Sequence, residues 1–91
     1  MQLRWTEDAA NDLEQIADYL FEHSPERAAK LVRKIYEFPA KLLAFPLRGR
    51  LGKKQGTREL ILAPLPYIVI YSVRGDLIYI ARILHGAQHR P

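Results

Sequence analysis

The chain has 91 residues, 48% of them hydrophobic and 26% charged, a mix typical of one globular domain spanning residues 1–91 and not of a disordered chain. The absence of cysteine excludes disulfides, thiolate metal sites and cysteine nucleophiles, and three scattered histidines predict no metal site. No apolar run reaches the roughly 18 residues of a membrane span, and the N-terminus turns acidic where a signal peptide would be apolar, so we expect a cytoplasmic protein.

Charge is distributed unevenly along the chain. Residues 1–45 carry six Lys and Arg against eight Asp and Glu, a net charge of −2, whereas residues 46–91 carry eight against two, a net charge of +6. This asymmetry favours an anionic partner for the C-terminal half: nucleic acid, an acidic protein, or both. The alternative is that the basic residues keep a small sheet soluble and protect its edges.

The N-terminal half predicts a short strand followed by a helical hairpin. Residues 3–5 favour a strand, and Thr6 is a suitable N-cap for a helix with an acidic first turn. The apolar positions of that helix follow the helical period and are Ala9, Leu13, Ile16, Ala17, Leu20 and Phe21. Ser24 and Pro25 predict the N-cap and first residue of a second helix, which Pro39 is expected to kink or interrupt. The predicted buried residues of the second helix are Ala28, Leu31, Val32, Ile35, Leu42 and Phe45.

The C-terminal half predicts a loop and three strands. Residues 46–56 hold three glycines and four basic residues without helical or strand periodicity, which indicates an exposed basic loop. Three β-branched or aromatic runs follow, at residues 58–63, 67–73 and 77–84, so we expect an antiparallel meander whose middle strand is covered on both faces. The order strand, helix, helix, strand, strand, strand predicts an α+β fold, with the N-terminal strand and the helical hairpin packed on a mostly antiparallel sheet.

The first candidate functional cluster is the basic loop. Its cations are Arg48, Arg50, Lys53 and Lys54, and Arg58 follows at the start of a strand. Such a group of charges can bind phosphates, and the loop glycines allow backbone amides to approach a ligand closely. The alternative is an ordinary solvated loop.

The second candidate cluster lies on the last predicted strand and just after it, and it consists of Arg82, His85, Gln88, His89 and Arg90. Strand alternation places Arg82 on the face of Ile78 and Ile80, where a charge needs a partner. Glu59 is a candidate partner, which would make Arg82 structural. His85 is a candidate general acid or base near neutral pH, with a satisfied histidine at a strand end as the alternative.

The remaining polar and aromatic residues predict no further chemistry. The strand tyrosines Tyr67, Tyr71 and Tyr79 favour the core or its rim over base stacking. Serine occurs only at positions 24 and 72, and no nucleophile paired with a base is visible. The sequence has no P-loop and no dinucleotide fingerprint, so no cofactor is expected.

Five segments match one family of small proteins, in order and over nearly the whole chain. They are Trp5-Thr6-Glu7 with Ala10, Asp12-Leu13 and Ile16; Phe45 to Arg50; Gly56 to Leu60; Pro66 to Tyr71; and Ile83 to Gln88. Together they resemble the RelE/ParE superfamily of toxins from type II toxin–antitoxin systems. The resemblance implies the α+β fold above and a small bacterial, plasmid-stabilising toxin that inhibits growth until a co-encoded antitoxin neutralises it. It also implies contact with operator DNA only through the antitoxin, and neither a cofactor nor a metal.

The superfamily divides by target, and the RelE-like branch matches this sequence in part. RelE-like members cut mRNA on the ribosome without a metal, using arginine, lysine and a histidine or tyrosine. The residues near such positions here are Lys53, Lys54, Arg58 and His85. An arginine of that branch is replaced by Ile68, a tail arginine is missing near Ala87, and no tyrosine follows His85.

ParE-like members lack those catalytic residues, act on DNA gyrase and share a Leu-His pair, here Leu84-His85. We therefore favour a ParE-like toxin acting on DNA gyrase over a RelE-like, ribosome-dependent mRNA endoribonuclease, and leave open whether the chain is an enzyme. An inactive member that only regulates its own promoter with the antitoxin is a third alternative. The candidate catalytic residues are Arg58, Arg82 and His85. The candidate contacts to the target or to nucleic acid are Arg48, Arg50, Lys53 and Lys54.

Overall fold

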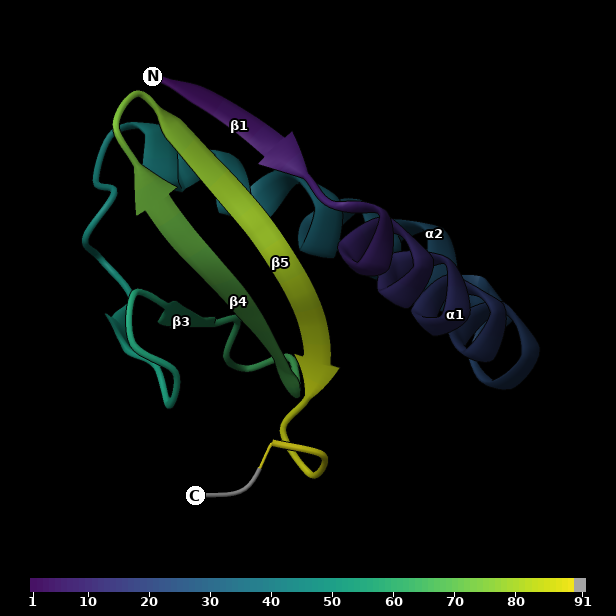
Figure 1. The fold of residues 1–91 in the computed structure, drawn as a ribbon. Coiled ribbons are helices and arrows are strands. Elements are labelled where there is room, and N and C mark those ends of the chain that lie inside the picture. The colour runs from purple at the N-terminus through teal and green to yellow at the C-terminus, as the bar shows by residue number, and fades with distance from the viewer. Residues whose placement is uncertain (90–91) are drawn as a thin grey trace.

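Two helices pack beside a five-stranded sheet in the computed structural model, which describes residues 1–89 (Figure 1). The elements in chain order are β1 (Gln2–Trp5), α1 (Glu7–His23), α2 (Pro25–Glu37), the 3₁₀ helix η1 (Phe38–Leu43), β2 (Arg50–Leu51), β3 (Arg58–Ile61), β4 (Tyr67–Arg74) and β5 (Leu77–His85). The predicted α+β class is confirmed, as are the three C-terminal strands.

The strand order in the sheet is β1-β5-β4-β3-β2. The three meander strands pair antiparallel, as predicted, whereas β1 pairs parallel with β5 from Gln2 opposite Leu77 to Trp5 opposite Ile80. The prediction of a loop without strands at residues 46–56 is wrong, because β2 pairs antiparallel with β3 inside it. A strand of two residues is too short to show an alternating pattern, so the sequence carried no signal for it.

The helix boundaries follow the predicted signals. Thr6 caps α1, since its side chain accepts a hydrogen bond from the backbone N–H of Ala9. Ser24 stands at the N-cap position of α2, but its side chain makes no capping bond, so only its predicted position is confirmed. Pro39 interrupts the second helix as expected: α2 ends at Glu37 and the chain continues as η1.

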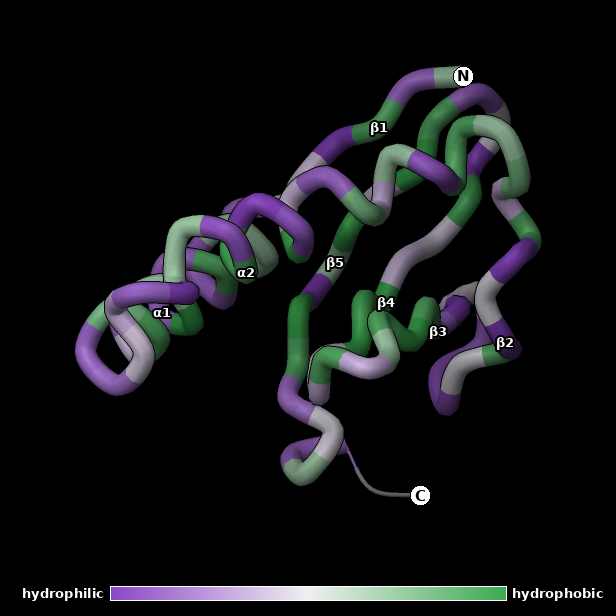
Figure 2. Tube along the Cα trace, turned by 180° about the vertical axis from the view of Figure 1, so that it is seen from behind, coloured by the Kyte–Doolittle hydropathy of each residue, from purple (hydrophilic) through white to green (hydrophobic). Residues whose placement is uncertain are grey.

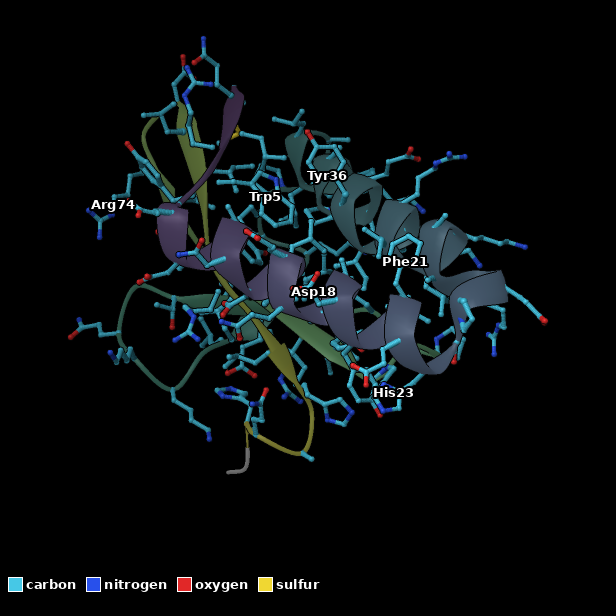
Figure 3. All side chains as sticks on the ribbon, turned by 90° about the vertical axis from the view of Figure 1, so that its right-hand side faces the viewer. Trp5, Asp18, Phe21, His23, Tyr36 and Arg74 are labelled. Atoms are coloured by element: carbon cyan, nitrogen blue, oxygen red, sulfur yellow. The ribbon has the colours of Figure 1, made fainter. Side chains whose placement is uncertain are left out.

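The core lies between the helical hairpin and the sheet and is built from the buried side chains Ala9, Leu20, Ala28, Ile35, Leu42, Leu60, Leu62, Tyr67, Val69, Tyr71, Ile78, Ile80 and Ile83. Figure 2 shows hydrophobic residues along β4 and β5 and polar ones around β2. Two expected core residues are exposed instead, Phe21 and Phe45. Figure 3 shows Phe21 on the side of the hairpin that faces away from the sheet.

Candidate functional site

β1 pairs with β5 only as far as Ile80. Thr6 and the first half of α1 form hydrogen bonds to the part of the β5 edge that follows. Past Trp5, the backbone N–H of Thr6 donates to the carbonyl of Ile80 at 3.0 Å, and the Thr6 hydroxyl donates to the carbonyl of Ala81 at 3.0 Å. One turn further, Asp12 Oδ2 accepts from the backbone N–H of Ile83 at 2.9 Å. An exposed strand edge is a template for unwanted pairing, and here the N-cap residue Thr6 and the Asp12 side chain of α1 satisfy it.

Asp12 also holds Arg82. The guanidinium donates twice to the carboxylate, from Nε to Oδ2 at 2.7 Å and from Nη2 to Oδ1 at 3.0 Å. Hydrogen bonding to Asp12, reinforced by its charge, raises the pKa of Arg82. The predicted pairing of Arg82 with Glu59 is therefore wrong.

The predicted face of Arg82 is also wrong, and a β-bulge is the reason. Ile80 pairs with Tyr71 and Arg82 pairs with Ile70, which leaves Ala81 as an extra residue in β5. Residues beyond a bulge change face, so Arg82 lies on the face of Ile70, opposite the buried Ile80, and Ile83 joins the core.

His85 ends β5 on the core face of the sheet. Its ring packs edge-on against Tyr67 with centroids 5.6 Å apart. The backbone N–H of Ala87 donates to His85 Nδ1 at 3.0 Å, so the neutral ring carries its proton on Nε2. The side-chain oxygen of Gln88 accepts from the backbone N–H of His85 at 3.1 Å, which fixes the turn after the strand.

Arg82 and His85 line the same cleft, of roughly 760 Å³, between the helical hairpin, residues 64–66 and the end of β5. Its polar and aromatic lining includes Tyr19, Arg27, Tyr67, Arg82, His85 and Gln88. Burial, and to a smaller extent the charge of Tyr19, raise the pKa of Tyr67, so its hydroxyl stays a neutral donor at neutral pH. The cleft therefore offers an anionic ligand the guanidinium groups of Arg27 and Arg82, an imidazole and two phenols, although the Asp12 carboxylate that binds Arg82 also lines it. Arg90, predicted to belong to the same cluster, lies outside the described residues.

Arg58, the third candidate catalytic residue, lies elsewhere. It pairs across the ladder with Tyr71, whereas His85 pairs with Tyr67 four positions along β4, a separation of about 13 Å along the strand. Arg58 Nη1 donates to the carbonyl of Gly49 at 2.8 Å and to that of Leu47 at 3.3 Å. The structure thus brings together two of the three candidates and uses Arg58 to hold the basic loop.

The cations of the basic loop are also divided. Arg48 lies over the ring of Phe38, with its guanidinium carbon 5.7 Å from the centroid. Arg50 donates to Glu59 at 2.8 Å. Lys53 and Lys54 are exposed, and Lys53 lines a shallow hollow with Arg50, Glu59 and His89.

Glu59 is the charged residue among the buried side chains of residues 1–89, with only 4% of its surface exposed. One carboxylate oxygen binds Arg50 and the other binds Nε2 of His89, which draws the C-terminal segment over the open face of the sheet. Burial alone would raise the pKa of Glu59, but the hydrogen bonds from His89 and Arg50, with their charges, outweigh it and lower the pKa below its ordinary value of 4.5.

Replacing Glu59 with glutamine is expected to lower the free energy of unfolding by about 1–2 kcal/mol near neutral pH, because two partners lose an anionic acceptor. A carboxylate whose pKa is lowered by folding stabilises the folded state above its unfolded pKa, and this stabilisation is lost as the pH falls below 4.5. In urea titrations, the difference in unfolding free energy between wild type and Glu59→Gln should therefore be smaller at about pH 3.5 than at about pH 7. Glu22→Gln, at an exposed position of α1, is the control. A difference that stays constant with pH would contradict this role of Glu59.

Two further properties concern metal binding and membranes. Within residues 1–89, no group of three or more His, Asp or Glu side chains is arranged to hold a metal ion. No helix in the same range is long and apolar enough to cross a membrane.

Comparison with known proteins establishes the family. A family model described as the ParE toxin of the type II toxin–antitoxin system parDE matches residues 3–90. The chain belongs to the ParE toxin family. Its fold agrees: in the structure of the chromosomal ParDE toxin–antitoxin system from P. aeruginosa, one chain matches with a TM-score of 0.87 and 35% identity, over 93% of this chain and 95% of that one.

Two sequence relatives support the ParE-family assignment. The Y4kP protein of Sinorhizobium fredii is 36% identical over 90 residues, which cover 99% of this chain and 93% of that protein. Toxin RelE2 of Caulobacter vibrioides is 37% identical over 87 residues, 96% of this chain and 97% of that toxin. The predicted membership of the RelE/ParE superfamily is confirmed, and this ParE-family chain is the toxin of a type II toxin–antitoxin system.

One residue of the cleft, Asp12, was not recognised as functional from the sequence. It lies three residues after Ala9 and four before Ile16, both on the face of α1 that packs toward the sheet. A carboxylate at that spacing needs a cation or a backbone donor. That spacing was the available signal for the pair with Arg82.

Proposed function

We propose that this toxin acts in the cytoplasm on DNA gyrase, that a co-encoded antitoxin neutralises it, and that it contacts operator DNA only through that antitoxin. The observation that carries the gyrase assignment is the separation of the groups that RNA cleavage would need. Arg58 donates to loop carbonyls, Arg82 is held by Asp12, and His85 lies about 13 Å along the sheet from Arg58. General acid–base catalysis requires its groups within hydrogen-bonding reach of one substrate.

The similarity to the P. aeruginosa ParDE system gives further support, since it extends over nearly the whole chain. On this proposal Arg82 and Asp12 stabilise the fold. The basic-loop residues Arg48, Arg50, Lys53 and Lys54 are contacts to partner molecules.

The second candidate is a RelE-like, ribosome-dependent endoribonuclease, and the cleft favours it. Arg82, His85 and Tyr67 lie together there, and a relative at 37% identity is named RelE2. In that mechanism a 2′-hydroxyl attacks the adjacent phosphate, which forms a 2′,3′-cyclic phosphate and breaks the bond to the 5′-oxygen of the next nucleotide. His85 would take the proton of the 2′-hydroxyl and give a proton to the leaving 5′-oxygen, and Arg82 would stabilise the charge that develops on the phosphate.

Purified toxin is expected to inhibit DNA supercoiling by gyrase and to leave intact an mRNA translated in a cell-free system. Supercoiling is followed by gel electrophoresis of plasmid DNA, and mRNA integrity by primer extension. Toxin premixed with its antitoxin is the control for both assays, and the same toxin preparation must stop growth when it is expressed in cells.

Cuts that are phased to codons and depend on translation would overturn the gyrase proposal. In that case His85→Ala should reduce cleavage by about 10²–10⁴-fold, because a proton-transfer group is lost. Cleavage that survives both His85→Ala and Arg82→Ala would remove the cleft as the catalytic site.

A further inference from the structure

Three large apolar side chains are exposed within seven residues of the chain. Phe45 is 67% exposed, Leu47 64% and Leu51 77%. Phe45 and Leu47 border a hollow with Arg48, and Leu51 lies on the edge strand β2 beside Lys53. We name residues 45–51 the apolar loop surface. Exposed apolar residues gathered in one segment are typical of a surface that another protein covers.

The backbone of the apolar loop surface is held by buried or half-buried groups. The hydroxyl of Tyr71, a fully buried residue, donates to the carbonyl of Pro46 at 2.7 Å and accepts from the N–H of Gly49 at 2.8 Å. Arg58 binds the carbonyls of Leu47 and Gly49 from the same side. Phe45 and Leu47 are therefore presented by a backbone that is already ordered. Binding of a partner does not incur the loss of conformational entropy that ordering this segment would require.

The charge around this surface has one sign. Residues 38–58 contain six Lys and Arg and no Asp or Glu. Arg50 is neutralised by Glu59, and Lys41 and Arg48 lie over the ring of Phe38. Lys53 and Lys54 are exposed, and Lys53 lines the same hollow as Leu51, so positive charge is accessible to a partner there. A complementary partner carries negative charge, and its apolar side chains bury Phe45, Leu47 and Leu51. An acidic protein segment with bulky apolar residues has both properties.

We propose that the apolar loop surface docks an acidic segment of the antitoxin whose bulky apolar side chains cover Phe45, Leu47 and Leu51. This inference rests on the chain's being a toxin with an antitoxin and is independent of the cellular target. Arg58 and Tyr71 act as positioning residues, because they hold the backbone that presents the contact side chains.

The test measures the affinity of the purified antitoxin encoded beside the toxin for toxin variants, by calorimetry. Leu47→Glu combined with Leu51→Glu places negative charge where the acidic segment docks, and we expect an affinity loss of about 30-fold or more. Lys53→Glu combined with Lys54→Glu should weaken binding less and flatten its dependence on salt. Phe21→Glu, at another exposed aromatic position on the far side of the hairpin, is the matched control and should keep wild-type affinity.

Each outcome decides the proposal, provided that far-ultraviolet circular dichroism shows every variant folded. Wild-type affinity in the leucine double variant overturns it. Loss of growth arrest with retained antitoxin affinity assigns the surface to the target instead, and also overturns it. Selective loss of binding to a single-stranded oligonucleotide, with antitoxin affinity unchanged, would make the surface a nucleic-acid contact. Failure of wild-type toxin to inhibit gyrase leaves the affinity result, and hence this inference, untouched.

Discussion

The Asp12→Ala variant is expected to lose about 2–3 kcal/mol of unfolding free energy. The change removes both hydrogen bonds to Arg82 and leaves the backbone N–H of Ile83 without its acceptor at the edge of β5. Arg82 is half-exposed and can return to water, so most of the loss comes from the orphaned amide and the uncovered edge. Urea denaturation at neutral pH measures it.

Two variants separate the contributions at this position. Arg82→Ala breaks the ion pair but keeps the bond from Ile83 to Asp12, so it should cost only about 1 kcal/mol. Asp18→Ala, at an exposed position of the same helix (Figure 3), should change stability by less than about 0.5 kcal/mol. Equal losses of unfolding free energy for Asp12→Ala and Arg82→Ala would show that the hydrogen bond from the Ile83 N–H to Asp12 adds no stability.

Gly49→Ala is expected to destabilise the fold by about 2–3 kcal/mol through overpacking. An added Cβ would lie 2.7 Å from both Cε1 and the hydroxyl oxygen of Tyr71 and 2.8 Å from the carbonyl oxygen of Glu59. Tyr71 is fully buried and β3 holds the Glu59 backbone, so neither neighbour can move away at low cost. The thermal midpoint should fall accordingly, with weaker antitoxin binding as a second result.

Gly86→Ala is the matched control for that change. Its Cβ would meet only the carbonyl oxygen of Pro66, at an ordinary 3.7 Å, so its thermal midpoint should stay close to that of the wild type. If Gly49→Ala unfolds at the same temperature as Gly86→Ala, the loop can shift away from Tyr71, and the fixed backbone inferred for residues 45–51 does not exist.

Most of the fold could be predicted, because local signals and burial agree. Thr6 caps a helix whose apolar stripe packs on the sheet, Pro39 ends the next helix, and the three apolar runs form strands at the expected positions. The parallel pairing of β1 with β5 was not predictable, because strand periodicity does not identify a partner far along the chain. Phe21 and Phe45 continue the helix-like spacing but are exposed, because this spacing shows which side chains share a face and not whether another part of the chain covers them.

Prediction of the candidate site was less complete, for two physical reasons. The bulge at Ala81 reverses the alternation on which the face of Arg82 was judged, and nothing in the residue types around it signals an inserted position. Arg58 on β3 and His85 on β5 carry the right chemistry but pair with β4 residues four positions apart, and distance along a sheet depends on register. The sequence therefore identified the candidate cationic residues but did not show which of them lie close together in the fold.

The parallel pair of β1 and β5 also constrains the order in which the fold forms. Gln2 lies opposite Leu77, so β1 has no neighbour in the sheet until β5 has been made. Contacts between such distant segments form late and require the intervening chain to be ordered. The pairing of β1 with β5 is thus expected to form only after β5 has been synthesised, late in the folding of this domain.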